Sequence, residues 1–157
     1  MPLYIQVLIG WAAAFKAYYG ICLFYYIGAF LTVVINIYTP SEWPPAFGTF
    51  SNAFTVRKMW GSCWHQWMRR PCGEAGRIVK ELCGFRTGSF ASRYSQVWAG
   101  FTISALAHHT GAMVGGFEDN GFWQCIYFMS QPLAIMGEDF IMFLGRSIGI
   151  EGSRKSS

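Results

Sequence analysis

The stretch Val97–Gly116, VWAGFTISALAHHTGAMVGG, contains no Asp, Glu, Lys or Arg. At a helical rise of about 1.5 Å per residue it spans roughly 30 Å, the thickness of the hydrocarbon core of a bilayer. Two histidines, His108 and His109, lie just past its middle. An ionisable side chain at membrane depth costs free energy, so it usually faces the protein interior and has a function. The alternative is that both imidazoles are neutral and hydrogen-bonded to neighbours such as Ser104 or Thr110.

The composition of the whole chain agrees with a membrane protein. Its 157 residues are 53% apolar, 18% aromatic and only 13% charged, whereas soluble domains carry about 25% charged residues. Seven Trp, eight Tyr and fourteen Phe suit aromatic belts at the membrane surfaces. We therefore interpret the net charge of +4 as a sign of membrane topology, and we expect no nucleic-acid partner.

The cysteines and histidines predict neither a metal site nor a disulfide framework. The five cysteines form no C-x-x-C pair, and the chain has only three histidines. A membrane di-iron enzyme would need many more histidine ligands than this.

Apolar runs divide the chain into three predicted membrane helices, so the expected fold is all-α and multi-pass, in a single domain over residues 1–157. The predicted spans are residues 17–38, 97–116 and 121–144. Pro40 ends the first span, and Pro132 is expected to kink the third. The apolar segment 3–15 is too short to span, and we interpret it as a remnant of a span or an interfacial segment.

Residues 41–96 form the one long polar region and are predicted to lie in the cytosol. The region carries eight basic residues against three acidic ones. This orientation also returns the basic residues of the tail to the cytosol, namely Arg146, Arg154 and Lys155. Eleven of the twelve basic residues then lie on one side of the membrane, as the positive-inside rule expects.

Within that region, residues 55–70 are interpreted as one amphipathic helix on the membrane surface. Thr55 is the expected N-cap and Pro71 the expected stop. Three tryptophans at helical spacing would share one face of this helix, next to basic residues. They are Trp60, Trp64 and Trp67.

Four motifs follow one another over about a hundred residues. Residues 43–48, WPPAFG, are similar to W-P-P-x-F-G, and residues 55–70, TVRKMWGSCWHQWMRR, are similar to S-x-R-x-F-W-G-R-x-W-H-Q. Residues 101–109, FTISALAHH, are similar to F-x-x-S-G-x-x-H, and residues 131–139, QPLAIMGED, are similar to Q-x-x-x-I-x-x-E-D. In these motifs the chain resembles the wax synthase-like branch of the membrane-bound O-acyltransferases. The most similar group acetylates fungal terpenoids and related secondary metabolites, which implies a partial version of that family's fold.

The resemblance implies transfer of an acyl group, expected to be acetyl, from a CoA thioester to the hydroxyl of a small lipophilic acceptor. Acetyl-CoA would be a co-substrate, and no bound cofactor is expected. The family's general base is a histidine inside a membrane helix, which here is His108, and His65 occupies the family's second polar position. An imidazole can accept a hydroxyl proton near neutral pH. Candidates for the acyl donor and the oxyanion are Trp64, Gln66, Arg57, Arg69 and Arg70. Packing alone also explains the tryptophans, and topology alone explains the basic residues.

The chain departs from the family pattern in two motif positions and in length. Ser62 stands where the signature has Arg, and Ala105 stands where it has Gly. Family members are more than twice as long. The alternative function is therefore a catalytically inactive truncated paralogue, or a membrane scaffold or assembly subunit that pairs with a partner chain. In either case we expect an integral, multi-pass protein of the endoplasmic reticulum, in contact with the bilayer.

Overall fold

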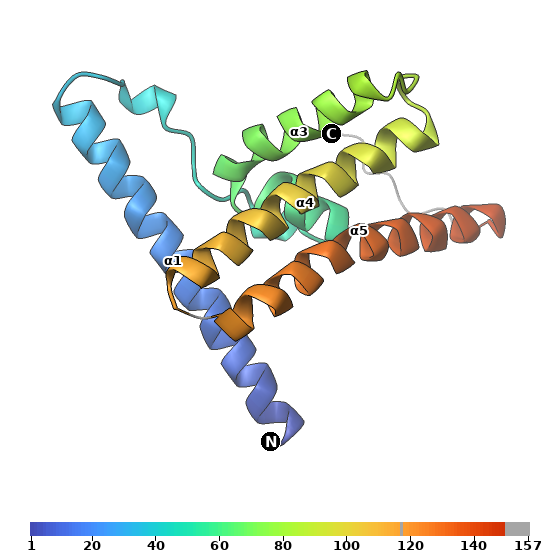
Figure 1. The fold of residues 1–157 in the computed structure, drawn as a ribbon, viewed down its shortest axis with the longest axis horizontal. Helices are drawn as coiled ribbons and strands as arrows, with labels where there is room; N and C mark the ends of the chain where they lie inside the picture. The colour runs from blue at the N-terminus through green and yellow to red at the C-terminus, as the bar shows by residue number, and fades with distance from the viewer. Residues whose placement is uncertain (117, 150–157) are drawn as a thin grey trace.

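A computed structural model of the chain describes residues 1–116 and 118–149. All regular secondary structure among these residues is helical, which confirms the all-α prediction. The four long helices are α1 (Leu3–Val34), α3 (Arg69–Leu82), α4 (Phe90–Val114) and α5 (Glu118–Ser147). Helices α3, α4 and α5 lie side by side, while α1 stands off to one side (Figure 1).

Helix α1 differs from the predicted first span at both ends. It starts at Leu3, so the segment 3–15 continues into the span, and Lys16 does not interrupt it because lysine is a good helix former. It ends at Val34 rather than at Tyr38, because Asn36 takes a left-handed conformation with φ of 56°. None of its residues is buried. By length and composition, α1 is the one helix in the described part of the chain that could cross a membrane.

The other two predicted spans correspond to parts of longer helices. Residues 97–114 of the predicted second span are the C-terminal part of α4, and Gly115 and Gly116 lie beyond its end. The helix begins earlier than predicted, at Phe90, where the Ser89 hydroxyl accepts a hydrogen bond from the Ser92 amide at 3.1 Å. Residues 121–144 lie within α5, which keeps Pro132 buried in its interior. The seam between α4 and α5 holds the hydrophobic core, made of Phe101, Ala105, Phe128 and Ile135.

The prediction of one helix over residues 55–70 is wrong. The segment breaks into α2 (Val56–Lys58), a π-helical turn η3 (Met59–Cys63) and a 3-10 turn η4 (Gln66–Met68). Thr55 does cap it, since its hydroxyl accepts a hydrogen bond from the Lys58 amide at 3.0 Å. Pro71 does not stop it, because it lies in the first turn of α3, where a missing N–H costs no helical hydrogen bond.

The break also separates the three tryptophans, which do not share a helix face. Trp60 is half-buried and packs against the core between α4 and α5. Trp67 is 66% exposed. The backbone leaves the helix after Cys63 because Trp64 is extended and the Gln66 amide donates to the Ala46 carbonyl at 2.9 Å. Backbone contacts with a distant segment therefore override the local helical pattern.

Aromatic contacts connect α1 to the rest of the chain through residues 43–48. The Tyr25 hydroxyl donates a hydrogen bond to the Pro44 carbonyl, and its ring lies edge-on to Trp43 with centroids 4.9 Å apart. The Tyr18 ring lies 4.4 Å from that of Phe47. The segment 43–48 is thus the bridge between the apolar helix and the turns that follow it.

Candidate functional site

The segments 43–48 and 59–66 form one unit through their backbones. The Gly48 amide donates to the Cys63 carbonyl at 2.8 Å, in addition to the bond between Gln66 and Ala46. Ala46 and Cys63 are fully buried at this contact. A side-chain carbon added at Gly48 would lie only 1.9 Å from the Ser62 carbonyl oxygen. The first two sequence motifs therefore make direct contact, and only glycine fits at position 48.

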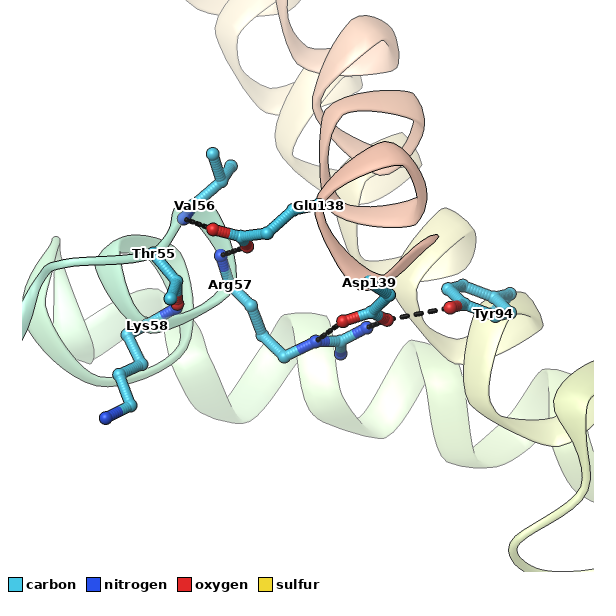
Figure 2. Close-up of polar contacts among 7 residues, drawn as sticks. All are labelled: Thr55, Val56, Arg57, Lys58, Tyr94, Glu138 and Asp139. Carbon is cyan, nitrogen blue, oxygen red and sulfur yellow. Dashed lines mark hydrogen bonds and ion pairs between the residues drawn. The ribbon is translucent and has the colours of Figure 1, made fainter. Parts of the chain in front are cut away.

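Two carboxylates of α5 hold the start of the second motif (Figure 2). The Glu138 oxygens accept hydrogen bonds from the Val56 and Arg57 amides at 3.0 and 3.2 Å. The Asp139 carboxylate accepts from Arg57 Nη2 at 2.5 Å and from the Tyr94 hydroxyl at 2.7 Å. The fourth motif thus binds the second one directly, and Tyr94 of α4 joins the same group.

A third side chain of α5 supports the π-helical turn η3. Trp60 Nε1 donates to Gln131 Oε1 at 3.0 Å. The Trp60 ring also lies edge-on to Phe101 and Phe128, with centroids 5.6 and 5.9 Å apart. The turn before His65 is therefore fixed against both α4 and α5.

These contacts border an open cavity of about 630 Å³ that both His65 and His108 line. Its walls come from α3, α4, α5 and the turns before them. Aromatic and apolar residues in the cavity lining include Trp60, Trp64, Val97, Phe101, Phe128 and Ile135. Basic and polar residues of α3, α4 and the turn between them also line it; they include Arg69, Lys80, Thr87, Arg93 and Gln96. The cavity therefore combines apolar side chains, two imidazoles and several cationic side chains.

His108 lies against the aromatic wall of the cavity. Its ring stacks on Phe128, with centroids 4.2 Å apart and an interplanar angle of 18°. Ser104, one turn earlier on the same face of α4, also lines the cavity, and its hydroxyl contacts the Cys72 thiol at 3.5 Å. Within the described residues, His108 makes no hydrogen bond to Ser104 or Thr110. His108 is exposed and lines the cavity.

His109 faces away from the cavity, toward α5. A carbon added at Gly121 would lie 2.7 Å from His109 Nδ1, so the two helices approach closely there. This nitrogen is buried and has no hydrogen-bond partner among the described residues. Of the two adjacent histidines, only His108 lines the cavity.

His65 occupies an unusual backbone conformation, with φ of 46° and ψ of 58°. Non-glycine residues seldom adopt this left-handed region, and such strained residues gather at functional sites. The side chain is half-buried, and its ring lies 6.4 Å from that of Phe47. Burial and the nearby imidazole of His108 both lower the pKa of His65. His65 is therefore neutral at pH 7.

The lowered pKa of His65 predicts a loss of stability in mild acid. The unfolded chain binds a proton at His65 more readily than the folded one, so stability falls as pH drops below the ordinary value of about 6.5. We expect the Tm of the wild type to fall when the pH decreases from about 7.5 to about 5.5, and to fall by more than the Tm of His65→Gln does. A parallel loss of stability in the two proteins would mean that another group is responsible.

The structure brings some of the predicted site residues to the cavity and leaves others outside. Trp64, His65 and His108 line it together with Arg57 and Arg69. Gln66 and Arg70 do not, and the Gln66 amide group donates instead to the Trp64 carbonyl at 3.1 Å. Lys80 and Arg93 also line the cavity, although nothing in the sequence distinguishes them from the other basic residues of region 41–96. Among the described residues, no group of three or more His, Cys, Asp or Glu side chains could hold a metal ion.

The two departures from the motif pattern lie in different surroundings. Ala105 is buried in the seam between α4 and α5, so its methyl group fills core space. Ser62 is exposed, and its hydroxyl donates to the Lys58 carbonyl at 2.9 Å, within the turn.

Comparison with known proteins agrees with the motifs that meet at this cavity. The model of the membrane-bound O-acyl transferase family matches residues 43–130, more than half of the chain. The chain belongs to this O-acyltransferase family. The matched residues include the segments 43–48, 55–70 and 101–109, and they end just before Gln131.

The relatives of this O-acyltransferase family member include several proteins named acetyltransferases. Acetyltransferase sirH of Leptosphaeria maculans is 36% identical over 154 residues, which are 98% of this chain and 38% of that protein. Acetyltransferase ple2 of Rhodocybe pseudopiperita is 32% identical over 71% of this chain and 30% of its own length. O-Mevalon transferase macI of Penicillium terrestre is 35% identical over 64% of this chain and 26% of its own length. The chain thus spans well under half the length of these relatives. No solved structure matches it.

Proposed function

We propose that this chain carries the catalytic centre of an O-acyltransferase that moves an acetyl group from acetyl-CoA to a hydroxyl of a small lipophilic acceptor, such as a terpenoid. The observation that carries the proposal is the cavity in which His65 and His108 meet, although they come from separate motifs. Family membership supports the acyl transfer, and the relatives named acetyltransferases support the acetyl group.

In the proposed reaction His108 is the general base. Its imidazole accepts the proton of the acceptor hydroxyl, whose oxygen attacks the thioester carbonyl carbon. The tetrahedral intermediate then collapses, the C–S bond breaks, and the CoA thiolate takes up the proton. His65 and Trp64 Nε1 are candidate donors to the developing oxyanion, since both side chains line the cavity. The aromatic wall around His108 suits a lipophilic acceptor.

The cationic side chains that line the cavity are the proposed contacts for the phosphates of CoA. Arg93 and His108 lie on the same helix, fifteen residues and therefore about 22 Å apart along its axis. That separation suits a donor with its thioester at one end and its phosphates at the other. Arg57 is a weaker candidate, because Asp139 already neutralises it. Arg69, Lys80 and Arg93 line the cavity and form no ion pair among the described residues.

Removal of a cavity-lining cation should therefore weaken donor binding. A hydrogen bond to a charged group contributes about 1.5–3 kcal/mol, so Lys80→Ala or Arg93→Ala should raise KM for acetyl-CoA by about tenfold or more. Arg70→Ala removes the same charge from outside the cavity and is the matched control. Equal effects of all three variants would indicate a general electrostatic effect instead of a phosphate site.

We further propose that the protein is multi-pass, with α4 and α5 at membrane depth beside α1 and residues 41–96 in the cytosol. The excess of basic residues in that region supports this orientation. The family supports a membrane location, and we propose the endoplasmic reticulum. Two of the basic residues expected in the cytosol, Arg154 and Lys155, lie outside the described residues.

The test is transfer of radiolabelled acetyl groups from acetyl-CoA to terpenoid alcohols by membranes that contain the chain. We expect a labelled ester that depends on the chain and on the alcohol. If folded protein in lipid forms no ester and releases no CoA, the proposed activity is wrong. The non-catalytic alternative, a scaffold that keeps the motifs for assembly, would then explain the site.

A further inference from the structure

One face of α5 contacts both segments that carry the cavity histidines. Phe128, Gln131, Ile135 and the pair Glu138–Asp139 recur at intervals of three or four residues, which places them on the same side of the helix. Phe128 stacks on His108, and Gln131 accepts the hydrogen bond of Trp60. Helix α5 thus contacts both segments that carry the two imidazoles.

The orientation of the short helix α2 depends on its contacts with this face of α5. It has only three residues, and isolated helices of this length are not stable in water. Glu138 satisfies the amides of Val56 and Arg57, as a cap does for the first turn of a helix, and its negative charge suits that end. The Asp139 carboxylate accepts hydrogen bonds from Nε and Nη2 of Arg57 and so fixes the Arg57 side chain (Figure 2).

The direction of α2 in turn sets the place of His65. The backbone passes from Lys58 through the π-helical turn Met59–Cys63 without an irregular residue between them. The turn closes with the Trp64 amide donating to the Met59 carbonyl at 2.7 Å, and His65 follows in its left-handed conformation. A rotation of α2 would therefore move His65 within the cavity, while His108 on α4 would stay in place.

We propose that Glu138 and Asp139 are positioning residues for His65, which hold α2 and the π-helical turn so that this imidazole faces the same cavity as His108. The inference rests on the proposed function in one respect, the participation of His65 in the reaction. The contact between α5 and α2 does not depend on the proposed function. A purely structural ion pair would instead stabilise the whole fold and leave the local geometry of His65 unaffected.

The experiment combines hydrogen exchange with steady-state kinetics on the full chain in lipid nanodiscs. Glu138→Gln replaces one acceptor oxygen with a donor that faces an amide, and Asp139→Asn removes the charge that Arg57 binds. We expect faster exchange in peptides covering residues 59–66 and unchanged exchange in Phe90–Val114. We also expect kcat to fall by about 100-fold, because a displacement of a catalytic group by about 1 Å can cause a loss of this size. KM for acetyl-CoA should change little. Glu81→Gln, which breaks the exposed ion pair with Arg77 on α3, is the matched control and should change neither quantity.

Two results would overturn the inference. One is faster exchange throughout α4 as well, because the pair would then stabilise the fold in general. The other is unchanged exchange over residues 59–66 in a folded variant. If the acidic variants do not fold, Tyr94→Phe removes one hydrogen bond to Asp139 and should give the same local pattern in weaker form. If the wild type transfers no acetyl group, the proposed function fails, but the exchange data still decide whether the pair holds the turn.

Discussion

Replacement of His108 by glutamine is expected to lower kcat for acetyl transfer by about 10²–10⁴-fold, the usual contribution of a general base. Glutamine has a similar size but accepts no proton near neutral pH. KM for acetyl-CoA should change little, because Arg93, one of the proposed phosphate contacts, lies about 22 Å from His108 along α4. The measurement is the initial rate of labelled ester formation, normalised to folded protein.

The adjacent residue offers the matched control for this variant. His109→Gln makes the same chemical change in the same helix, but His109 faces Gly121 rather than the cavity. Its kcat should stay close to that of the wild type once the amount of folded protein is taken into account. Equal losses of kcat in both variants would contradict the assignment of His108 as the base, because only His108 of these two residues lines the cavity.

The sequence predicted the helical class, because this depends on local composition. It also singled out His65 and His108 as candidates from their motifs, and the structure places both at one cavity. Runs of uncharged residues are sufficient to indicate helices such as α1 and α4. The sequence did not predict the break at Trp64, because the bonds that replace the helix there come from residues 43–48. Helical spacing of tryptophans describes only the preference of the segment itself, and tertiary contacts override it.

The role of the fourth motif could not be read from sequence for a similar reason. Glu138 and Asp139 look like charges at the end of a membrane helix. Their partners, Val56 and Arg57, lie about eighty residues earlier in the chain. The carboxylate of Glu138 binds backbone amides, which leave no side-chain signal in a sequence. The neighbouring Asp139 pairs with the Arg57 side chain, which is likewise a contact that the sequence does not reveal.

The largest effect on stability is expected from Gly48→Ala. The added methyl would lie 1.9 Å from the Ser62 carbonyl oxygen and 3.2 Å from the Cys63 α-carbon, and both atoms belong to the backbone. Backbone cannot rotate away as a flexible side chain can, so the segments 43–48 and 59–66 must separate. This separation would break the bonds from the Gly48 and Gln66 amides and expose the buried side chain of Cys63.

We expect this variant to lose about 3 kcal/mol or more, the upper range for an overpacked site, which corresponds to a fall in Tm of about 6–12 °C for a chain of this size. Gly137→Ala is the matched control, because a methyl group at that position of α5 would meet no atom within 4 Å. It should raise Tm slightly, since alanine favours a helix over glycine by roughly 0.5–1 kcal/mol. Thermal unfolding of both variants in the same detergent measures the difference. An unchanged Tm in Gly48→Ala would show that the first two motifs do not touch through their backbones, and the enclosure of the cavity beside His65 would have to be reconsidered.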